Sequence, residues 1–191
     1  MEPRDAAALI GPAVPGPGGT WADFGSGTGT FTRALAALLG PKGRIYAVDR
    51  DRRAAASLRA WAAAQARHFA GAPAPLAAID VLEADFADLA RPLDLPPLDG
   101  ALVANALHFV SEPEPVLARL AAGVRPGGRV VVVEYDDRPA SRWVPYPLPL
   151  ARLARLAEGA GLGAPTLVGT HPSAFGGRLY AAVGVRVPFE N

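Results

Sequence analysis

The sequence predicts an α/β fold with one doubly wound, mostly parallel seven-stranded sheet that is flanked by helices. Short apolar segments of strand length alternate with helical patterns from Thr20 to about Arg138, as in successive βαβ units. A glycine-rich run, Gly25–Gly29, separates the first strand pattern from the first long helical pattern. The chain has 191 residues, half of them hydrophobic, which suits one domain with a sizeable core. We therefore expect a single domain over residues 1–191.

Seven segments have the apolar or alternating pattern of strands. The run Val130–Val133 is apolar throughout, which is typical of a strand buried on both faces at the centre of a sheet. Just before it, Arg125–Gly128 contains a proline and two glycines, and we expect a turn there. The predicted strands cover residues 21–24, 44–48, 79–82, 101–104, 130–133, 166–168 and 179–185.

Helix signals lie between most of these strands. The first helical pattern stops at Gly40, a residue type that commonly ends a helix. Asp51 is placed to cap a long Ala-rich helix. Ser111 and Glu114 have the spacing of a capping box and predict the start of another helix. A final helix is expected over about residues 149–159.

Three segments have no regular pattern. Residues 1–19 form a short N-terminal extension that ends in a Pro/Gly-rich tract. Residues 86–98 form a Pro-rich connection that we expect to face solvent. Residues 136–149 are rich in Pro and aromatic side chains and are longer than an ordinary connection. Because they follow the central fifth strand, we expect them to form a lid at the carboxyl edge of the sheet.

Charge and composition exclude several function classes. The formal net charge is +1, from 19 Lys+Arg and 18 Asp+Glu, so no overall field attracts nucleic acid or an anionic membrane. The absence of cysteine excludes disulfides, thiolate metal sites and a Cys nucleophile, and we expect no metal site. The sequence has neither a membrane-spanning apolar stretch nor the pattern of a signal peptide. We therefore expect a cytoplasmic protein.

The run Gly25-Ser26-Gly27-Thr28-Gly29 is the segment most indicative of ligand binding. Glycines between a strand and a helix let the backbone approach a ligand, and the helix N-terminus offers free N–H groups to an anionic end. A dinucleotide fingerprint requires a third Gly or Ala three positions after the second, and Thr30 occupies that position. The pattern is instead Asp23-x-Gly-x-Gly-x-Gly29.

This pattern resembles the first motif of the class I S-adenosylmethionine-dependent methyltransferases. The resemblance extends over about residues 21–182. It implies a Rossmann-like fold, S-adenosyl-L-methionine as cofactor and S-adenosyl-L-homocysteine as product. Asp49, 20 residues after Gly29 at the end of the second strand, resembles the family's second motif. The resemblance implies that its carboxylate accepts both ribose hydroxyls and that Arg50 lies along the adenine.

Two later segments extend the resemblance. Asp85 and Phe86 fall where the family places an acid for the adenine amino group and a backbone N–H for a ring nitrogen. Asn105 begins a run that resembles the family's segment beside the sulfonium. Taken alone, Asp49 could equally be a capping acid and Asp85 a loop acid, but ligands of open α/β sheets bind where successive strands end. The implied cofactor-binding residues are Asp23, Gly25, Ser26, Gly27, Thr28, Gly29, Asp49, Arg50, Asp85, Phe86 and Asn105.

The catalytic residue is less strongly indicated than the cofactor. Methyl transfer is an in-line displacement, for which positioning and desolvation supply much of the catalysis without a protein base. His108 follows the fourth strand and is the candidate base, with a pocket-lining or capping histidine as the alternative. Glu134 is interpreted as a structural or pocket-polar group. The candidate acceptor pocket contains Tyr135, Asp136, Trp143 and Tyr146, with His171 and Phe175 as weaker candidates.

We expect a small or medium-sized acceptor. Asn105-Ala-Leu-His108 differs from the Asn/Asp-Pro-Pro-Tyr run of enzymes that methylate base amines, and no Lys/Arg stripe offers a phosphate track. Many members of the family cover the acceptor with N-terminal helices, and we expect residues 136–149 to replace that cover here. A non-catalytic sensor or complex subunit, an RNA or protein methyltransferase and an NAD-dependent oxidoreductase remain as alternatives, and the oligomeric state is left open.

Overall fold

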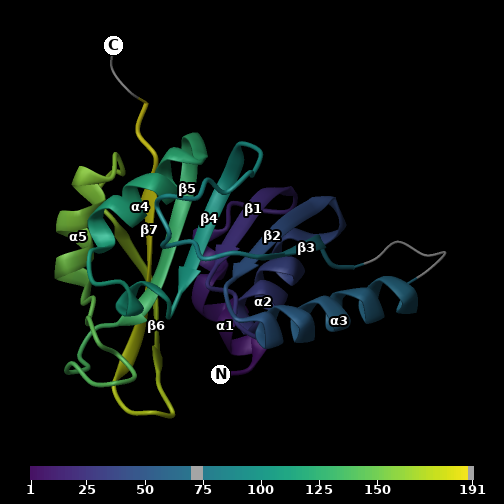
Figure 1. Cartoon of the computed structure of the whole chain (residues 1–191), viewed down its shortest axis with the longest axis horizontal. Helices are drawn as coiled ribbons and strands as arrows, with labels where there is room; N and C mark the ends of the chain where they lie inside the picture. The colour runs from purple at the N-terminus through teal and green to yellow at the C-terminus, as the bar shows by residue number, and fades with distance from the viewer. Residues whose placement is uncertain (70–74, 189–191) are drawn as a thin grey trace.

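Every predicted strand is present in the structure, a computed structural model that describes residues 1–69 and 75–188 (Figure 1). The strands are β1 (Gly19–Phe24), β2 (Gly43–Asp49), β3 (Ala78–Glu83), β4 (Leu98–Ala104), β5 (Val124–Tyr135), β6 (Thr166–Pro172) and β7 (Arg178–Val185). The α-helices are α1 (Pro3–Ile10), α2 (Thr30–Leu39), α3 (Arg52–His68), α4 (Pro113–Ala122) and α5 (Leu150–Gly159). Three short 3₁₀ helices are η1 (Gly11–Ala13), η2 (Gly40–Lys42) and η3 (Leu107–Phe109).

The strands form one seven-stranded sheet in the order β3-β2-β1-β4-β5-β7-β6. Strands β1 to β5 pair in parallel, whereas β7 is antiparallel to both β5 and β6. The sheet is therefore mixed. Strand β7 runs antiparallel to β6 because only a short turn joins the two strands, whereas parallel neighbours need a crossover of a dozen or more residues.

Helices cover both faces of the sheet (Figure 1). The side chains of β4 alternate between two hydrophobic cores: Ala101 and Val103 face the core that contains α4 and α5, and Leu102 faces the core that contains α1 and α2. Helix α3 packs beside β2 and β3. It begins as predicted, because the Asp51 carboxylate accepts hydrogen bonds from two backbone N–H groups of its first turn. Within the described residues, no helix combines the length and apolarity needed to cross a membrane.

The N-terminal extension contains a helix that the sequence interpretation missed. Helix α1 buries Ala6, Leu9 and Ile10 against α2. These residues have the i, i+3, i+4 spacing of one helix face, and Pro3 occupies a first-turn position that favours proline. Both signals were present, but the helix is only eight residues long and depends on tertiary packing for its stability.

Two local predictions were wrong. The capping box at Ser111 and Glu114 does not form, because α4 begins at Pro113 with Glu112 as its N-cap and no side-chain cap bond. Pro113 has no N–H, so one of the free donors that a cap would satisfy is absent. The turn predicted at Arg125–Gly128 lies inside β5, where the register with β4 shifts and the extra residues bulge out.

The Pro-rich connection is also less exposed than predicted. Phe86 is buried, and Leu93 and Leu95 pack against the core on the α4 face. Arg119 on α4 donates from Nη1 to the carbonyls of Asp88 (2.7 Å) and Arg91 (3.1 Å), and from Nη2 to the Phe86 carbonyl. The connection therefore covers part of the sheet in place of a helix.

We predict that Arg119→Ala lowers the free energy of unfolding by about 1–3 kcal/mol, because three carbonyls lose a charged donor. Urea denaturation and hydrogen exchange of residues 86–91 would measure the effect. Arg125→Ala is the matched control: the Arg125 side chain is exposed, and Asp99 keeps its hydrogen bond from the Thr20 N–H, so loss of this ion pair should cost less than about 0.5 kcal/mol. Equal effects of the two substitutions would contradict the role given to Arg119.

Candidate active site

The glycine loop lies between the end of β1 and the start of α2. Its three glycines have positive φ angles of 77°, 53° and 94° at Gly25, Gly27 and Gly29. A Cβ atom at Gly25 would lie 2.5 Å from the Ala106 side chain, and one at Gly29 would lie 2.4 Å from Leu58. At Gly27 a Cβ would meet nothing within 4 Å. The outer glycines are therefore required by packing, whereas Gly27 borders open space.

Polar groups from β2 and β3 approach this loop on one side. Asp49 Oδ2 accepts a hydrogen bond from the Gly27 N–H at 2.6 Å, and its Oδ1 accepts from the Asp51 N–H at 2.8 Å. Asp85 forms an ion pair of 3.1 Å with Arg50 and accepts from the Ala87 N–H at 2.9 Å. The two carboxylates thus lie at successive strand ends, as predicted, with partners that fix their orientation.

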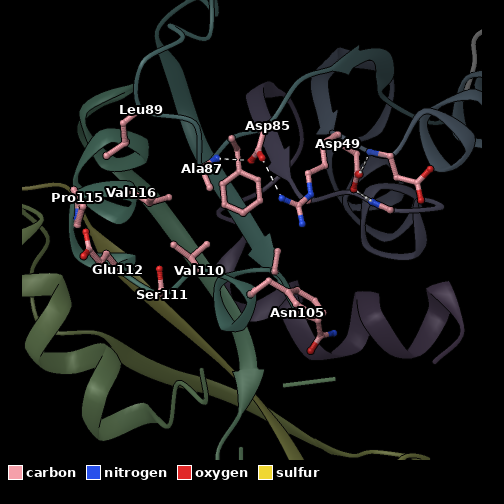
Figure 2. A pocket seen from close by; sticks show the side chains of 17 residues that line it. Asp49, Asp85, Ala87, Leu89, Asn105, Val110, Ser111, Glu112, Pro115 and Val116 are labelled. Carbon is pink, nitrogen blue, oxygen red and sulfur yellow. Dashed lines mark hydrogen bonds and ion pairs between the residues drawn. The ribbon is translucent and has the colours of Figure 1, made fainter. Parts of the chain in front are cut away.

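Cavity A occupies this side of the loop and has a volume of about 610 Å³. Figure 2 shows Asp49 and Asp85 on its wall with their hydrogen-bonded partners. Phe86 and Ala106 contribute apolar surface. Of the predicted cofactor-binding residues, those that line cavity A are Gly25, Gly27, Asp49, Arg50, Asp85, Phe86 and Asn105.

Cavity B, of about 780 Å³, lies on the other side of the same loop. It is lined by Asp23, Ser26 and Thr28 of the predicted set, and also by Glu2 and Asp5 at the start of the protein. The latter two were missed because α1 was not predicted. Two buried polar atoms at this cavity, Asp23 Oδ1 and Ser26 Oγ, have no hydrogen-bond partner in the described part of the chain. Such atoms can bond a ligand.

Asp23 is a buried carboxyl group with an unusual pKa. Burial raises its pKa from 3.8 to about 7, against the opposing effect of the hydrogen bond that it accepts from the Thr32 hydroxyl at 2.6 Å. The negative charge of Asp49 raises it further. The group is therefore partly protonated near neutral pH, and a nearby positive charge would favour its ionised form.

Cavity C, of about 580 Å³, lies beyond the end of β4. It contains the candidate base: His108 is 3% exposed, and its Nδ1 lies 2.6 Å from Oε2 of the fully buried Glu134. The His108 backbone N–H also donates to Oε1 of the same carboxylate at 3.2 Å. Glu134 thus fixes both the ring and the backbone of His108. The lining residues are Asn105, His108, Phe109, Tyr135, Arg138, Trp143, Val144 and Phe175.

Asn105 lines all three cavities. It immediately follows β4 and has a φ of 53°, a left-handed conformation that residues other than glycine adopt rarely. Its Oδ1 is buried and has no partner within residues 1–69 and 75–188. A left-handed backbone, which asparagine adopts more readily than most residues, and an unpaired buried oxygen at one residue mark Asn105 as a candidate functional position.

Two residues of the predicted acceptor pocket line none of these cavities. Asp136 accepts a hydrogen bond from the Leu150 N–H at the start of α5 (3.0 Å) and lies 3.4 Å from Arg178. Its position is that of a helix-capping acid, which the sequence interpretation did not consider. Tyr146 is 42% exposed, and only its backbone N–H reaches the site, where it donates to the His108 carbonyl.

The other residues predicted for the acceptor pocket lie on the cavity walls, whereas Gly29 of the predicted cofactor-binding set lines none of the three cavities. Tyr135 and Phe175 line cavities B and C, Trp143 lines cavity C, and His171 lines cavity B. The sequence interpretation missed Arg138. Apart from the ionisable His108, it is the one charged residue among the described residues that lines cavity C. A signal existed in the sequence: Arg138 is a cation within an aromatic and Pro-rich segment.

A family model that matches more than half of the chain identifies a family. A family model described as a methyltransferase domain matches residues 22–130. An uncharacterized 37.1 kDa protein in transposon TN4556 of Streptomyces fradiae is 29% identical across 80% of this chain and 46% of that protein. A ribosomal RNA small subunit methyltransferase H from Verminephrobacter eiseniae is 48% identical over 44 residues, 23% of this chain and 13% of that enzyme. The chain thus spans less than half the length of either relative.

Solved structures share the fold at low identity. A SAM dependent methyltransferase from Aquifex aeolicus aligns with a TM-score of 0.71 and 18% identity, over 96% of this chain and 90% of that chain. Burkholderia thailandensis 1,6-didemethyltoxoflavin-N1-methyltransferase, with bound 1,6-didemethyltoxoflavin and S-adenosylhomocysteine, aligns with a TM-score of 0.69 and 21% identity. That alignment covers 97% of this chain and 78% of that chain.

The Asp23 pKa predicts a pH-dependent stability. Because the folded-state pKa is raised, the stabilisation is fully present below pH 3.8 and is lost as the pH rises to about 7. At 1.36 kcal/mol per pKa unit the loss is roughly 4 kcal/mol. In urea denaturation, Asp23→Asn should therefore lose less stability than the parent protein as the pH rises from 4 to 8, roughly by that amount. Asp80→Asn, at an exposed ion pair, is the control. A parallel pH dependence in the parent and Asp23→Asn would contradict the prediction.

Proposed function

Because the chain belongs to the family of methyltransferase domains, we propose that it transfers a methyl group from S-adenosyl-L-methionine to a small or medium-sized acceptor. The observation that carries the proposal is the meeting of cavities A, B and C at Asn105, directly after β4. Ligands of open α/β sheets bind at this edge, where the strand order reverses between β1 and β4. Cavities A and B would hold the cofactor, and cavity C the acceptor.

The residues of cavity A fit the adenosine part of the cofactor. The Asp49 carboxylate retains lone pairs beyond the two N–H groups that it binds, so it can also accept the ribose hydroxyls. Asp85 and the Phe86 backbone would contact the adenine, and Arg50 would lie along its face. Gly27 leaves space at the junction of cavities A and B that any larger side chain would fill.

The residues of cavity B fit the methionine part. Asp23 Oδ1 and Ser26 Oγ are buried acceptors without partners, which suits a ligand ammonium group. When bound, S-adenosyl-L-methionine supplies a methyl group on a positively charged sulfur. Arg50 is the one Lys or Arg side chain that faces cavities A and B from the described residues. Seven carboxyl side chains line them, which suits a cationic ligand: Asp49, Asp51, Asp85, Glu112, Glu2, Asp5 and Asp23.

His108 is the proposed proton acceptor. An ionised Glu134 holds a proton on Nδ1 of the ring, which leaves the lone pair of Nε2 free to take a proton from an acceptor hydroxyl or amine. The Glu134 charge also stabilises the imidazolium that results. Glu134 is therefore proposed as a positioning residue, a more specific role than the structural one inferred from the sequence.

Residues 136–149 are proposed to cover the acceptor. Val144 and Leu148 are buried and anchor the segment, while Trp143 lines cavity C. The segment does not stand in for missing N-terminal cover, as the sequence suggested, because α1 is present and borders cavity B. The two sides of the site thus have separate covers.

The first test of this function is cofactor binding. We predict that S-adenosylmethionine and S-adenosylhomocysteine bind with 1:1 stoichiometry in calorimetry and that NADH does not. Gly27→Ala should weaken binding of S-adenosylhomocysteine about tenfold or more, because its Cβ enters ligand space. Its positive φ adds local backbone strain, but the Cβ meets no packed protein, so the fold should survive. Gly29→Ala is the matched control and should instead destabilise the fold, because its Cβ would clash with Leu58. Tight NADH binding, or full binding by Gly27→Ala, would overturn the assignment.

The second test concerns His108. His108→Gln should lower kcat by about 10²- to 10⁴-fold, measured as S-adenosylhomocysteine formation with an acceptor from a metabolite screen. Binding of S-adenosylhomocysteine should change less than about threefold, since His108 lies outside cavities A and B.

Glu134→Gln tests the positioning role through ¹⁵N NMR of the His108 ring. Loss of the carboxylate should lower the population of the tautomer protonated at Nδ1, together with kcat. Unchanged ring signals alongside a reduced kcat would contradict this role, and an unchanged kcat in His108→Gln would remove His108 from catalysis.

A further inference from the structure

The walls of cavity C are flat and aromatic. Phe109, Tyr135, Trp143 and Phe175 line it, and three of them are at least half exposed at its rim. Large, partly exposed aromatic side chains gathered around one concave site are typical of a ligand surface rather than of scattered exposed residues. Their faces favour offset or edge contacts with a planar ring. An aliphatic acceptor would leave these contacts unmade.

Cavity C also differs in charge from its neighbours. Carboxyl groups line cavities A and B, whereas among the described residues no carboxyl group lines cavity C and Arg138 does. The Arg138 guanidinium lies 4.7 Å from the centre of the Tyr135 ring. The adjacent acids are engaged elsewhere: Asp136 with Leu150 and Arg178, and Asp137 with the Arg178 N–H. Within the described residues, no carboxylate forms an ion pair with Arg138.

An anionic group on the acceptor would supply the partner that Arg138 lacks. The planar guanidinium binds carboxylate, phosphate or sulfonate groups through two parallel hydrogen bonds, and its contact with Tyr135 restricts its orientation. A cationic acceptor would be repelled both by Arg138 and by a cationic cofactor in the adjoining cavities. The charge pattern therefore favours an anionic acceptor.

We propose that the acceptor is a planar aromatic compound with a hydroxyl group, which is methylated, and a separate anionic group, which Arg138 binds. This inference rests on the proposed methyl transfer. In the step, a lone pair of the acceptor oxygen forms the new O–C bond as the C–S bond breaks, and the bonding pair stays on the sulfur. The hydroxyl proton passes to Nε2 of His108, whose positive charge Glu134 offsets. The products are an aromatic methyl ether and a neutral thioether.

The proposal predicts the binding selectivity of the full chain loaded with S-adenosylhomocysteine, which cannot react. Three probes separate ring from charge: 6-hydroxy-2-naphthoate is planar and anionic, 6-hydroxy-2-naphthamide is planar and neutral, and 4-hydroxycyclohexanecarboxylate is anionic without an aromatic ring. In calorimetry the naphthoate should bind about tenfold more tightly than either of the others, as expected for a charge-assisted hydrogen bond or a stacked ring.

Two matched pairs of variants assign the selectivity to residues. Arg138→Gln should reduce the preference for the naphthoate over its amide to about twofold, whereas Arg142→Gln should retain it, because Arg142 stacks on Trp143 without lining cavity C. Trp143→Ala should weaken both naphthalene probes by about fivefold or more, whereas Tyr146→Ala should not, since Tyr146 lines no described cavity.

The outcomes distinguish this inference from the proposed function. If S-adenosylhomocysteine binds but the naphthoate is not preferred, or if Arg138→Gln keeps the preference, the acceptor class is wrong and methyl transfer still stands. If S-adenosylhomocysteine does not bind, the proposed function fails first. Preference for the naphthoate that depends on Arg138 and Trp143 supports the assignment.

Discussion

Parallel pairing of β1 with both β2 and β4 is the constraint on which the site depends. It brings the carboxyl ends of three buried strands to one edge, and the strand order reverses at β1, because the chain passes from β1 through β2 to β3 and then returns to β4 on the other side of β1. The loops after β1 and β4 then abut so closely that a Cβ at Gly25 would clash with Ala106. The same geometry places the Asp49 carboxylate against the Gly27 N–H. The division into cavities A and B follows from this one glycine loop, which runs between them.

The polar groups buried at this edge oppose stability. Asp23 and Ser26 each retain a buried oxygen without a partner in the described structure, and Asn105 adds a left-handed backbone. Groups of this kind cost free energy unless a ligand completes their hydrogen bonds. His108 and Glu134 are different, because they satisfy each other deep in the protein. Most other buried residues of the described chain are apolar, and three of its five unpaired buried polar atoms lie at this edge, which marks it as the part of the molecule shaped for a ligand.

The predictable features were those fixed by local pattern. Strand periodicity located all seven strands, and the spacing of Asp23, the glycines and Asp49 located the loop and its acidic neighbour. Features that depend on tertiary contacts could not be predicted from the sequence. Helix α1 depends on packing against α2, the connection at residues 86–98 is held by Arg119 from a distant helix, and Asp136 turns away to the start of α5. The contact of Glu134 with His108 was easier to predict. Strands β4 and β5 pair in register up to Ala104 and Val133, so the residues that follow these two lie near each other.

The sorting of charge among the three cavities bears on the direction of the proposed reaction. Before transfer, an anionic acceptor held by Arg138 would face a cationic sulfur held among carboxylates, and this attraction would favour joint binding. Transfer removes the charge on sulfur and leaves the proton on His108, while the acceptor keeps its anionic group. The attraction between the two ligands is therefore present for substrates and absent for products. The sulfonium charge thus helps to assemble the substrates and, once lost, no longer retains the products, whereas Arg138 binds the anionic group before and after transfer.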